Sequence, residues 1–174
     1  IAVALMLISP EMVLIFGSPK YREAVYVIPP VAASVFFIFI YNILSMPQFY
    51  YEKTQFLMAA SMAAAGANVV LNFIFIRLFG YIAAGYTTLA CYMLYSVGHY
   101  IVSKQILVNE GIQENLMNPG FLLACSVFLI GASIICNLIF PYRILRYVIL
   151  LASAGLVFWK KELLLKTMAD IRKK

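Results

Sequence analysis

The chain has 174 residues, of which 64% are hydrophobic and only 11% are charged, whereas about a quarter of the residues in a soluble domain carry a charge. Its formal net charge is +6 at pH 7 and its mean hydropathy is +0.94. These values exclude an ordinary soluble domain and predict an integral membrane protein. Because alanine, leucine, isoleucine and methionine occur without strict alternation, helices are favoured over a β-barrel.

Six hydrophobic segments follow one another along the chain, with spacings that suit a hydrocarbon core about 30 Å thick. The segments are residues 1–16, 24–44, 54–79, 82–103, 119–140 and 143–159. Glycine, proline and polar residues separate them at 17–19, 46–48, 80–81, 109–118 and 141–142, as is typical of turns. We therefore expect an all-α, polytopic bundle of about six membrane-spanning helices, with neighbours antiparallel.

The first segment, IAVALMLIS, begins with the chain itself. It has neither the basic flank nor the small-residue cleavage site of a signal peptide. We therefore expect the sequence to be a piece of a longer protein.

The second segment combines a predicted bend with a polar end. Pro29 and Pro30 each lack a backbone donor, so they are expected to bend the helix near its outer end. The opposite end is polar and aromatic, with Tyr41, Asn42, Gln48, Tyr50 and Tyr51. Bent helices with polar ends are common in transporters.

The third segment carries the most informative polar residues. Asn68 and Asn72 are four residues apart, so they share one helix face, and Ser61, Ala65 and Gly66 precede them. One interpretation is a cavity-facing stripe that binds a polar substrate. The other is a packing interface, in which small residues let helices approach and each asparagine bonds across it.

Arg77 follows Asn72 by five residues, near the outer end of the same segment. Its long side chain can reach the membrane surface, or it can hold a fixed charge inside the bundle. Both interpretations stay open from the sequence.

No catalytic or metal-binding pattern stands out. Cys91, Cys125 and Cys136 all fall inside predicted spans without metal-ligand spacing. His99, the single histidine, fits a packed or interfacial role or, alternatively, a proton relay. We expect no enzymatic activity, no cofactor and no nucleic-acid partner.

The distribution of lysine and arginine predicts the orientation, because short basic loops stay in the cytoplasm. Six alternating spans place eight basic residues on one side, namely Lys53, Lys104, Lys160, Lys161, Lys166, Arg172, Lys173 and Lys174. The other side has Lys20, Arg22, Arg77, Arg143 and Arg146. The C-terminus is therefore expected in the cytoplasm. Its basic tail, 161–174, is either a membrane-surface helix or a solvated end that enforces topology.

Two stretches of the sequence together carry a family resemblance. The first is SPEMVLIFGSPKYREAVYVIPP, with Phe16, Gly17, Tyr21 and Ala24. The second opens a helix at Lys53-Thr54 and continues with Asn68, Asn72, Gly80, Ala84, Gly85 and Thr88. Over about residues 10–103, the chain resembles the C-terminal lobe of the multidrug, oligosaccharidyl-lipid and polysaccharide exporter superfamily. It is most similar to the polysaccharide transporter and O-antigen flippase branch.

The resemblance implies an organisation and a function. Residues 1–104 would be four helices of the second transporter lobe, 105–160 two additional helices, and 161–174 the tail. The protein would flip an undecaprenyl-pyrophosphate-linked oligosaccharide across the bacterial inner membrane by alternating access. Its partners would be that cargo, membrane lipids and the N-terminal lobe of the same chain. The expected substrate-binding residues are Arg77, Asn68, Asn72 and Tyr41.

Two alternatives remain. A cation-coupled multidrug exporter has the same fold, but an acidic residue is then expected in the cavity, and no central span position here holds one. A non-transporting membrane scaffold would use its helices only for packing, so that Asn68 and Asn72 would affect stability alone.

Overall fold

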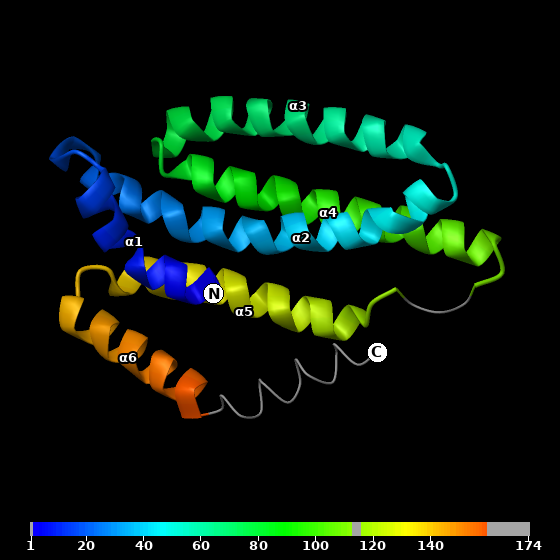
Figure 1. Cartoon of the computed structure of the whole chain (residues 1–174). Coiled ribbons are helices and arrows are strands. Elements are labelled where there is room, and N and C mark those ends of the chain that lie inside the picture. Colours follow the sequence, from blue (N-terminus) through cyan, green and yellow to red (C-terminus); the bar gives the residue numbers. More distant parts are fainter. Residues whose placement is uncertain (1, 113–115, 160–174) are drawn as a thin grey trace. The chain divides into compact units, whose positions relative to one another are not determined.

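A computed structural model describes residues 2–112 and 116–159. Its helices are α1 (Ala2–Phe16), the 3-10 helix η1 (Pro19–Val27), α2 (Ile28–Tyr50), α3 (Thr54–Phe79), α4 (Ala83–Asn109), α5 (Pro119–Ile139) and α6 (Arg143–Trp159). Figure 1 shows α3 and α2 running along α4. No strand occurs in the described ranges, so the predicted all-α fold is confirmed.

Three stretches of the described chain are long and apolar enough to cross a membrane, namely Tyr21–Tyr50, Thr54–Phe79 and Pro119–Ile139. They support an integral membrane protein. α4 has 27 residues and is long enough, but it is too polar to be among the three. α1 and α6 are shorter, with 15 and 17 residues.

The second predicted span differs from the expected one at both ends. Pro29 and Pro30 do not bend an existing helix; they lie in the first turn of α2, where η1 gives way to it. A proline is tolerated there because its missing N–H would have no partner in the helix anyway. At the other end, α2 continues through Pro47 to Tyr50, beyond the predicted end at residue 44. The chain turns instead at Glu52, which has a positive φ of 55°.

α2 and α4 form the best-packed pair, and they contact each other more extensively than any other two elements. Leu44 of α2 is 1% exposed and Leu89 of α4 is 5% exposed. Gly85 allows the close approach near the start of both helices: a Cβ there would lie 2.8 Å from Pro30 Cγ and 2.9 Å from the Val27 carbonyl oxygen.

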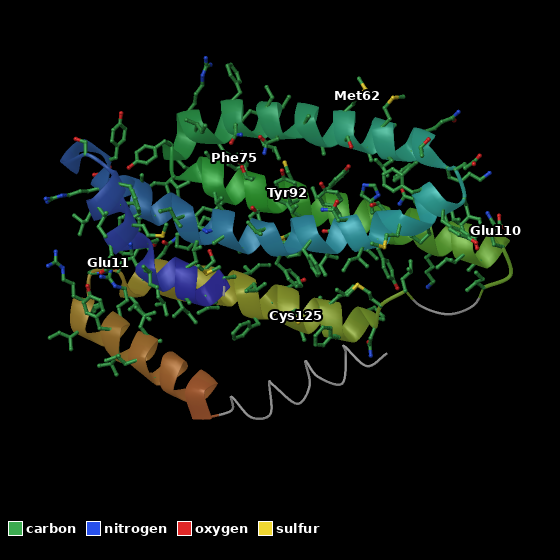
Figure 2. The ribbon with its side chains drawn as sticks, in the orientation of Figure 1. Glu11, Met62, Phe75, Tyr92, Glu110 and Cys125 are labelled. Atoms are coloured by element: carbon green, nitrogen blue, oxygen red, sulfur yellow. The ribbon has the colours of Figure 1, made fainter. Side chains whose placement is uncertain are left out.

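α3 packs on α4 in a different way, because none of its side chains is buried. Gly80 ends it with a φ of 77°, a conformation that favours glycine. Figure 2 shows Met62 on the side of α3 that points away from α4, and this residue is 71% exposed.

The chain divides into two compact units, residues 1–137 and 138–174. The division falls near the end of α5, whereas the predicted boundary after residue 104 concerns lobes of a larger protein and stays a prediction. In the second unit, the Arg146 guanidinium lies 5.3 Å from the Tyr147 ring centroid. The predicted basic tail, 161–174, lies outside the described residues.

Candidate functional site

A cavity of about 450 Å³ lies between α2, α3 and α4. Its lining consists of Tyr41, Ser61, Ala64, Ala65, Asn68, Val69, Thr88, Cys91, Tyr92 and Tyr95. We refer to this space as the tyrosine cavity. It joins a polar edge of hydroxyl and amide groups to three aromatic rings, in a wall that is otherwise made of small apolar side chains.

The three tyrosines of the cavity are held against one another. The Tyr41 ring is nearly parallel to Tyr92, with centroids 6.4 Å apart, and lies 4.7 Å from Tyr95. The Tyr95 hydroxyl shares a 2.6 Å hydrogen bond with Ser61 Oγ of α3. Figure 2 shows Tyr92 of α4 on the side that faces α3. Because rings with mutual contacts lose little freedom on binding, such a wall is already arranged for a ligand.

The two asparagines have different roles. Asn72 donates from Nδ2 to Asn68 Oδ1 at 2.9 Å, and its own Oδ1 accepts from the Thr87 hydroxyl of α4. Asn72 therefore joins α3 to α4, which is the packing role. Asn68 lines the cavity, and its amino group makes no hydrogen bond within the described ranges, so it is available to a ligand.

Arg77 does not line the tyrosine cavity. It lies nine residues after Asn68, which at about 3.6 residues per turn places it on about the opposite side of α3. Its guanidinium lies 3.9 Å from the centroid of the Phe73 ring, as in a cation–π contact. Of the four predicted residues, the structure brings together Tyr41 and Asn68 in one cavity, supported by Asn72.

The prediction from sequence missed most of the α4 side of the cavity. Thr88, Tyr92, Tyr95 and His99 follow one another at intervals of four, three and four residues, so they share one face of α4. This periodicity could have identified the aromatic wall; Thr88 entered the prediction only through the family resemblance, and Tyr92 and Tyr95 did not enter it.

A closed polar network adjoins the cavity. His99 contacts both Tyr41 and Tyr95, with ring centroids 5.8 and 4.4 Å apart. Its Nδ1 lies 2.9 Å from Gln48 Nε2. Gln48 in turn donates to Ser103 Oγ at 3.0 Å, and Ser103 donates to the Leu44 carbonyl oxygen. The network thus joins residues of α2 to residues of α4 that are at least 51 positions away in the sequence. No local pattern in the sequence reveals such a pairing.

The end of α4 near Gly80 is tied to η1 by a second set of contacts. The Tyr81 hydroxyl donates to a Glu23 carboxylate oxygen at 2.9 Å. Partial desolvation, this hydrogen bond and the negative charge of Glu23 all raise the pKa of the Tyr81 phenol. Asn137 of α5 donates to the Tyr26 carbonyl oxygen and to the Tyr86 hydroxyl at the same end.

No family model, curated protein or solved structure matches the chain. Within the described ranges, no group of three or more histidine, cysteine, aspartate or glutamate residues could hold a metal ion.

Proposed function

We propose that the chain is part of a transporter that moves a lipid-linked oligosaccharide across the bacterial inner membrane by alternating access. The tyrosine cavity would receive sugar units of the cargo. The observation that carries the proposal is the cavity lining, in which three tyrosine rings meet the amide of Asn68 and the hydroxyls of Ser61 and Thr88. A sugar has apolar ring faces and hydroxyl edges, so it suits aromatic faces combined with amide and hydroxyl partners.

The size of the cavity supports binding of a small group. Its volume of about 450 Å³ falls in the range of about 300–1,000 Å³ usual for ligand sites. A repeat unit of several sugars would extend beyond it. The N-terminal lobe implied by the family resemblance would then enclose the rest of the cargo.

The loose packing of α3 also favours transport. Two further cavities, of about 470 and 450 Å³, lie between α3 and α4. An element with few buried contacts costs less to displace than one in a tight interface. In alternating access, groups of helices rock around a binding site, and α3 is suited to such a movement against the α2–α4 pair.

The four proposed binding residues act in different places. Tyr41 and Asn68 would contact the sugar, and Asn72 would hold Asn68 in position. Arg77 would meet the pyrophosphate only where the cargo passes the opposite side of α3. A guanidinium suits that task because it binds phosphate oxygens through two parallel hydrogen bonds.

The membrane arrangement is part of the proposal. Six spans, counting the shorter α1 and α6 and the more polar α4, would place the C-terminus in the cytoplasm. A reporter fused after Lys174 should then report cytoplasm, and one inserted between Lys20 and Arg22 should report the outer side. Two reporters on the same side would refute this arrangement.

The proposal is tested by measuring the amount of surface polysaccharide in cells that need the complete protein to export it. Tyr41→Ala and Asn68→Ala are expected to reduce it strongly at an unchanged membrane level of the protein, because each removes a sugar contact. Met62→Ala, on the outward side of α3 (71% exposed), is the matched control and should have no effect. Normal polysaccharide in both cavity variants would refute the proposed cargo.

Arg77 is tested separately in the same assay. Arg77→Ala should reduce surface polysaccharide, and Arg77→Lys should keep part of the activity, because it retains the charge but not the bidentate geometry. Normal export by Arg77→Ala would show that the side chain only reaches toward the membrane surface. Loss of drug resistance with normal polysaccharide would instead favour the multidrug exporter, and loss of stability alone would favour the scaffold.

A further inference from the structure

Three polar side chains between α2 and α4 are completely enclosed. Gln48, His99 and Ser103 each have an exposed fraction of 0%, and His99 is the only histidine of the chain. Enclosing polar groups is costly unless they are hydrogen-bonded. Hydrogen bonds satisfy Gln48 and Ser103, but one ring nitrogen of His99 is left without a partner in the described part of the chain.

The hydrogen bonds around Gln48 have a defined direction. The Ser103 hydroxyl donates to the Leu44 carbonyl oxygen, so its oxygen is free to accept from Gln48 Nε2, 3.0 Å away. This orients the Gln48 amide. The second hydrogen on Nε2 then lies near His99 Nδ1, and the amide oxygen lies near the same atom.

The orientation lets Gln48 serve both protonation states of His99 Nδ1. Gln48 Nε2 is 2.9 Å from Nδ1 and Gln48 Oε1 is 3.1 Å from it. An unprotonated Nδ1 can accept from the amide N–H, and a protonated Nδ1 can donate to the amide oxygen. Because the Gln48 Nε2–H would oppose a protonated Nδ1, the amide has to turn slightly to present Oε1 when the proton binds.

The other ring nitrogen, His99 Nε2, is buried and has no hydrogen-bond partner within the described ranges. Aromatic rings surround the imidazole: Tyr41 of α2 at 5.8 Å, Tyr95 of α4 at 4.4 Å and Phe56 of α3 at 5.9 Å between centroids. Of the described residues whose rings contact the imidazole, Tyr41 and Tyr95 carry titratable phenols, and Phe56 of α3 does not. Aromatic faces attract a cation without neutralising it, so a protonated ring can be held here and released again.

We propose that His99 is a reversible proton-binding site linked to the tyrosine cavity. The proton comes from water and returns to water; its binding converts the neutral imidazole to imidazolium, and no other covalent bond changes. Tyr41 and Tyr95 both line the cavity and contact the His99 ring. A ligand that moves these rings changes the surroundings of the charge, so cavity occupancy and proton binding influence each other. The link to cargo rests on the proposed transport function, but the proton site itself does not.

The single histidine makes a direct test possible. The full chain, purified with a tag free of histidine and labelled with ¹⁵N-histidine, gives one pair of ring-nitrogen signals. We expect these signals to shift with pH in one reversible step between about pH 4 and 9, while circular dichroism shows an unchanged fold. Ring-nitrogen signals that stay constant over this range would refute the proton site.

Two matched pairs of variants test the network and its link to the cavity. Gln48→Met is expected to move the titration midpoint by about one pH unit or more, whereas Gln105→Met, at an exposed position of α4, should not. Tyr41→Ala should also move the midpoint, but Tyr21→Ala should not, because Tyr21 is an exposed residue of η1 outside the cavity lining. Equal midpoints within the first pair would refute the role of Gln48, and equal shifts within the second pair would refute the link.

These results separate the proton site from the transport proposal. A histidine that titrates as expected in a protein whose Tyr41→Ala and Asn68→Ala variants both export normal polysaccharide would refute the proposed cargo and keep the proton site. Lost export together with constant histidine signals would do the reverse. If a variant fails to fold, the titration of the unmodified chain still decides the main point.

Discussion

α2 and α3 both pack on α4, yet the two interfaces have opposite characters. The α2–α4 interface encloses a glutamine, a histidine and a serine, each with an exposed fraction of 0%. α3 buries none of its side chains, although it is apolar and long enough to cross a membrane. In the described part of the chain the most enclosed helix pair is also rich in polar groups, whereas the apolar helix α3 stays exposed. A bilayer explains the difference, since lipid covers apolar faces while polar groups must find partners inside the bundle.

The largest expected effect comes from filling the closest approach in the α2–α4 region. Gly85→Ala puts a Cβ 2.8 Å from Pro30 Cγ and 2.9 Å from a backbone oxygen, so it should lower the free energy of unfolding by about 1–3 kcal/mol. Gly66→Ala on α3 and Gly98→Ala on α4 meet nothing within 4 Å, and should be neutral or stabilising. Thermal unfolding in detergent measures all three. Equal losses would show that the two interfaces are packed alike.

The next effect concerns the enclosed hydroxyl of the α2–α4 interface. Ser103→Ala removes the donor to the Leu44 carbonyl oxygen and the acceptor for Gln48, and should cost about 1–3 kcal/mol because buried groups lose their partners. Ser61→Ala on α3 removes an exposed hydrogen bond to Tyr95 and should cost less than about 1 kcal/mol. Denaturant titration of both variants checks this order. A larger loss for Ser61→Ala would contradict the comparison.

A smaller effect is expected from the bond that joins α3 to α4. Asn72→Ala and Thr87→Val remove the same interhelical hydrogen bond. The double variant should therefore be more stable than the sum of the single losses predicts, by about 0.5–1.5 kcal/mol. Strictly additive losses would mean that this bond does not hold α3 in place.

The smallest effect depends on pH and lies in the turn after α3. Because the pKa of Tyr81 is raised from 10.0, its contribution to stability is complete below the ordinary tyrosine value. The contribution is lost as the pH rises through the raised value. Difference absorbance between the unmodified chain and Tyr81→Phe should show a phenol that ionises late. Glu23→Gln removes the negative charge and should bring ionisation to lower pH, and no change on that substitution would contradict the assigned cause.

Local sequence signals predicted much of the fold but missed some helix ends. The turn at Gly80 is at its predicted place because its φ of 77° favours glycine. The predicted end of the second segment at residue 44 is wrong, because the turn signal around Pro47 does not end α2, which continues to Tyr50. A proline interrupts only one backbone bond, so neighbouring helices can hold a span together across it.

Only part of the candidate site could be predicted from the sequence. The four-residue spacing of Asn68 and Asn72 predicted a shared helix face, and the two side chains are hydrogen-bonded. The spacing also indicates that Arg77 does not share the face of Asn68. Nine residues separate the two, which places Arg77 on about the opposite side of the helix. The pairing of Gln48 with His99 joins residues 51 positions apart, and it depends on how α2 and α4 pack in three dimensions.

Cargo protection of the tyrosine cavity tests the central claim most directly. In the complete protein with its native cysteines replaced, Ala65→Cys places a thiol in the cavity lining, and Lys53→Cys places one at an exposed position in the turn before α3. Both are labelled with a maleimide, with and without purified undecaprenyl-pyrophosphate-linked oligosaccharide. We expect the cargo to slow labelling of Ala65→Cys several-fold and to leave Lys53→Cys unchanged. Equal labelling rates at Ala65→Cys with and without the cargo would contradict a sugar site between α2, α3 and α4.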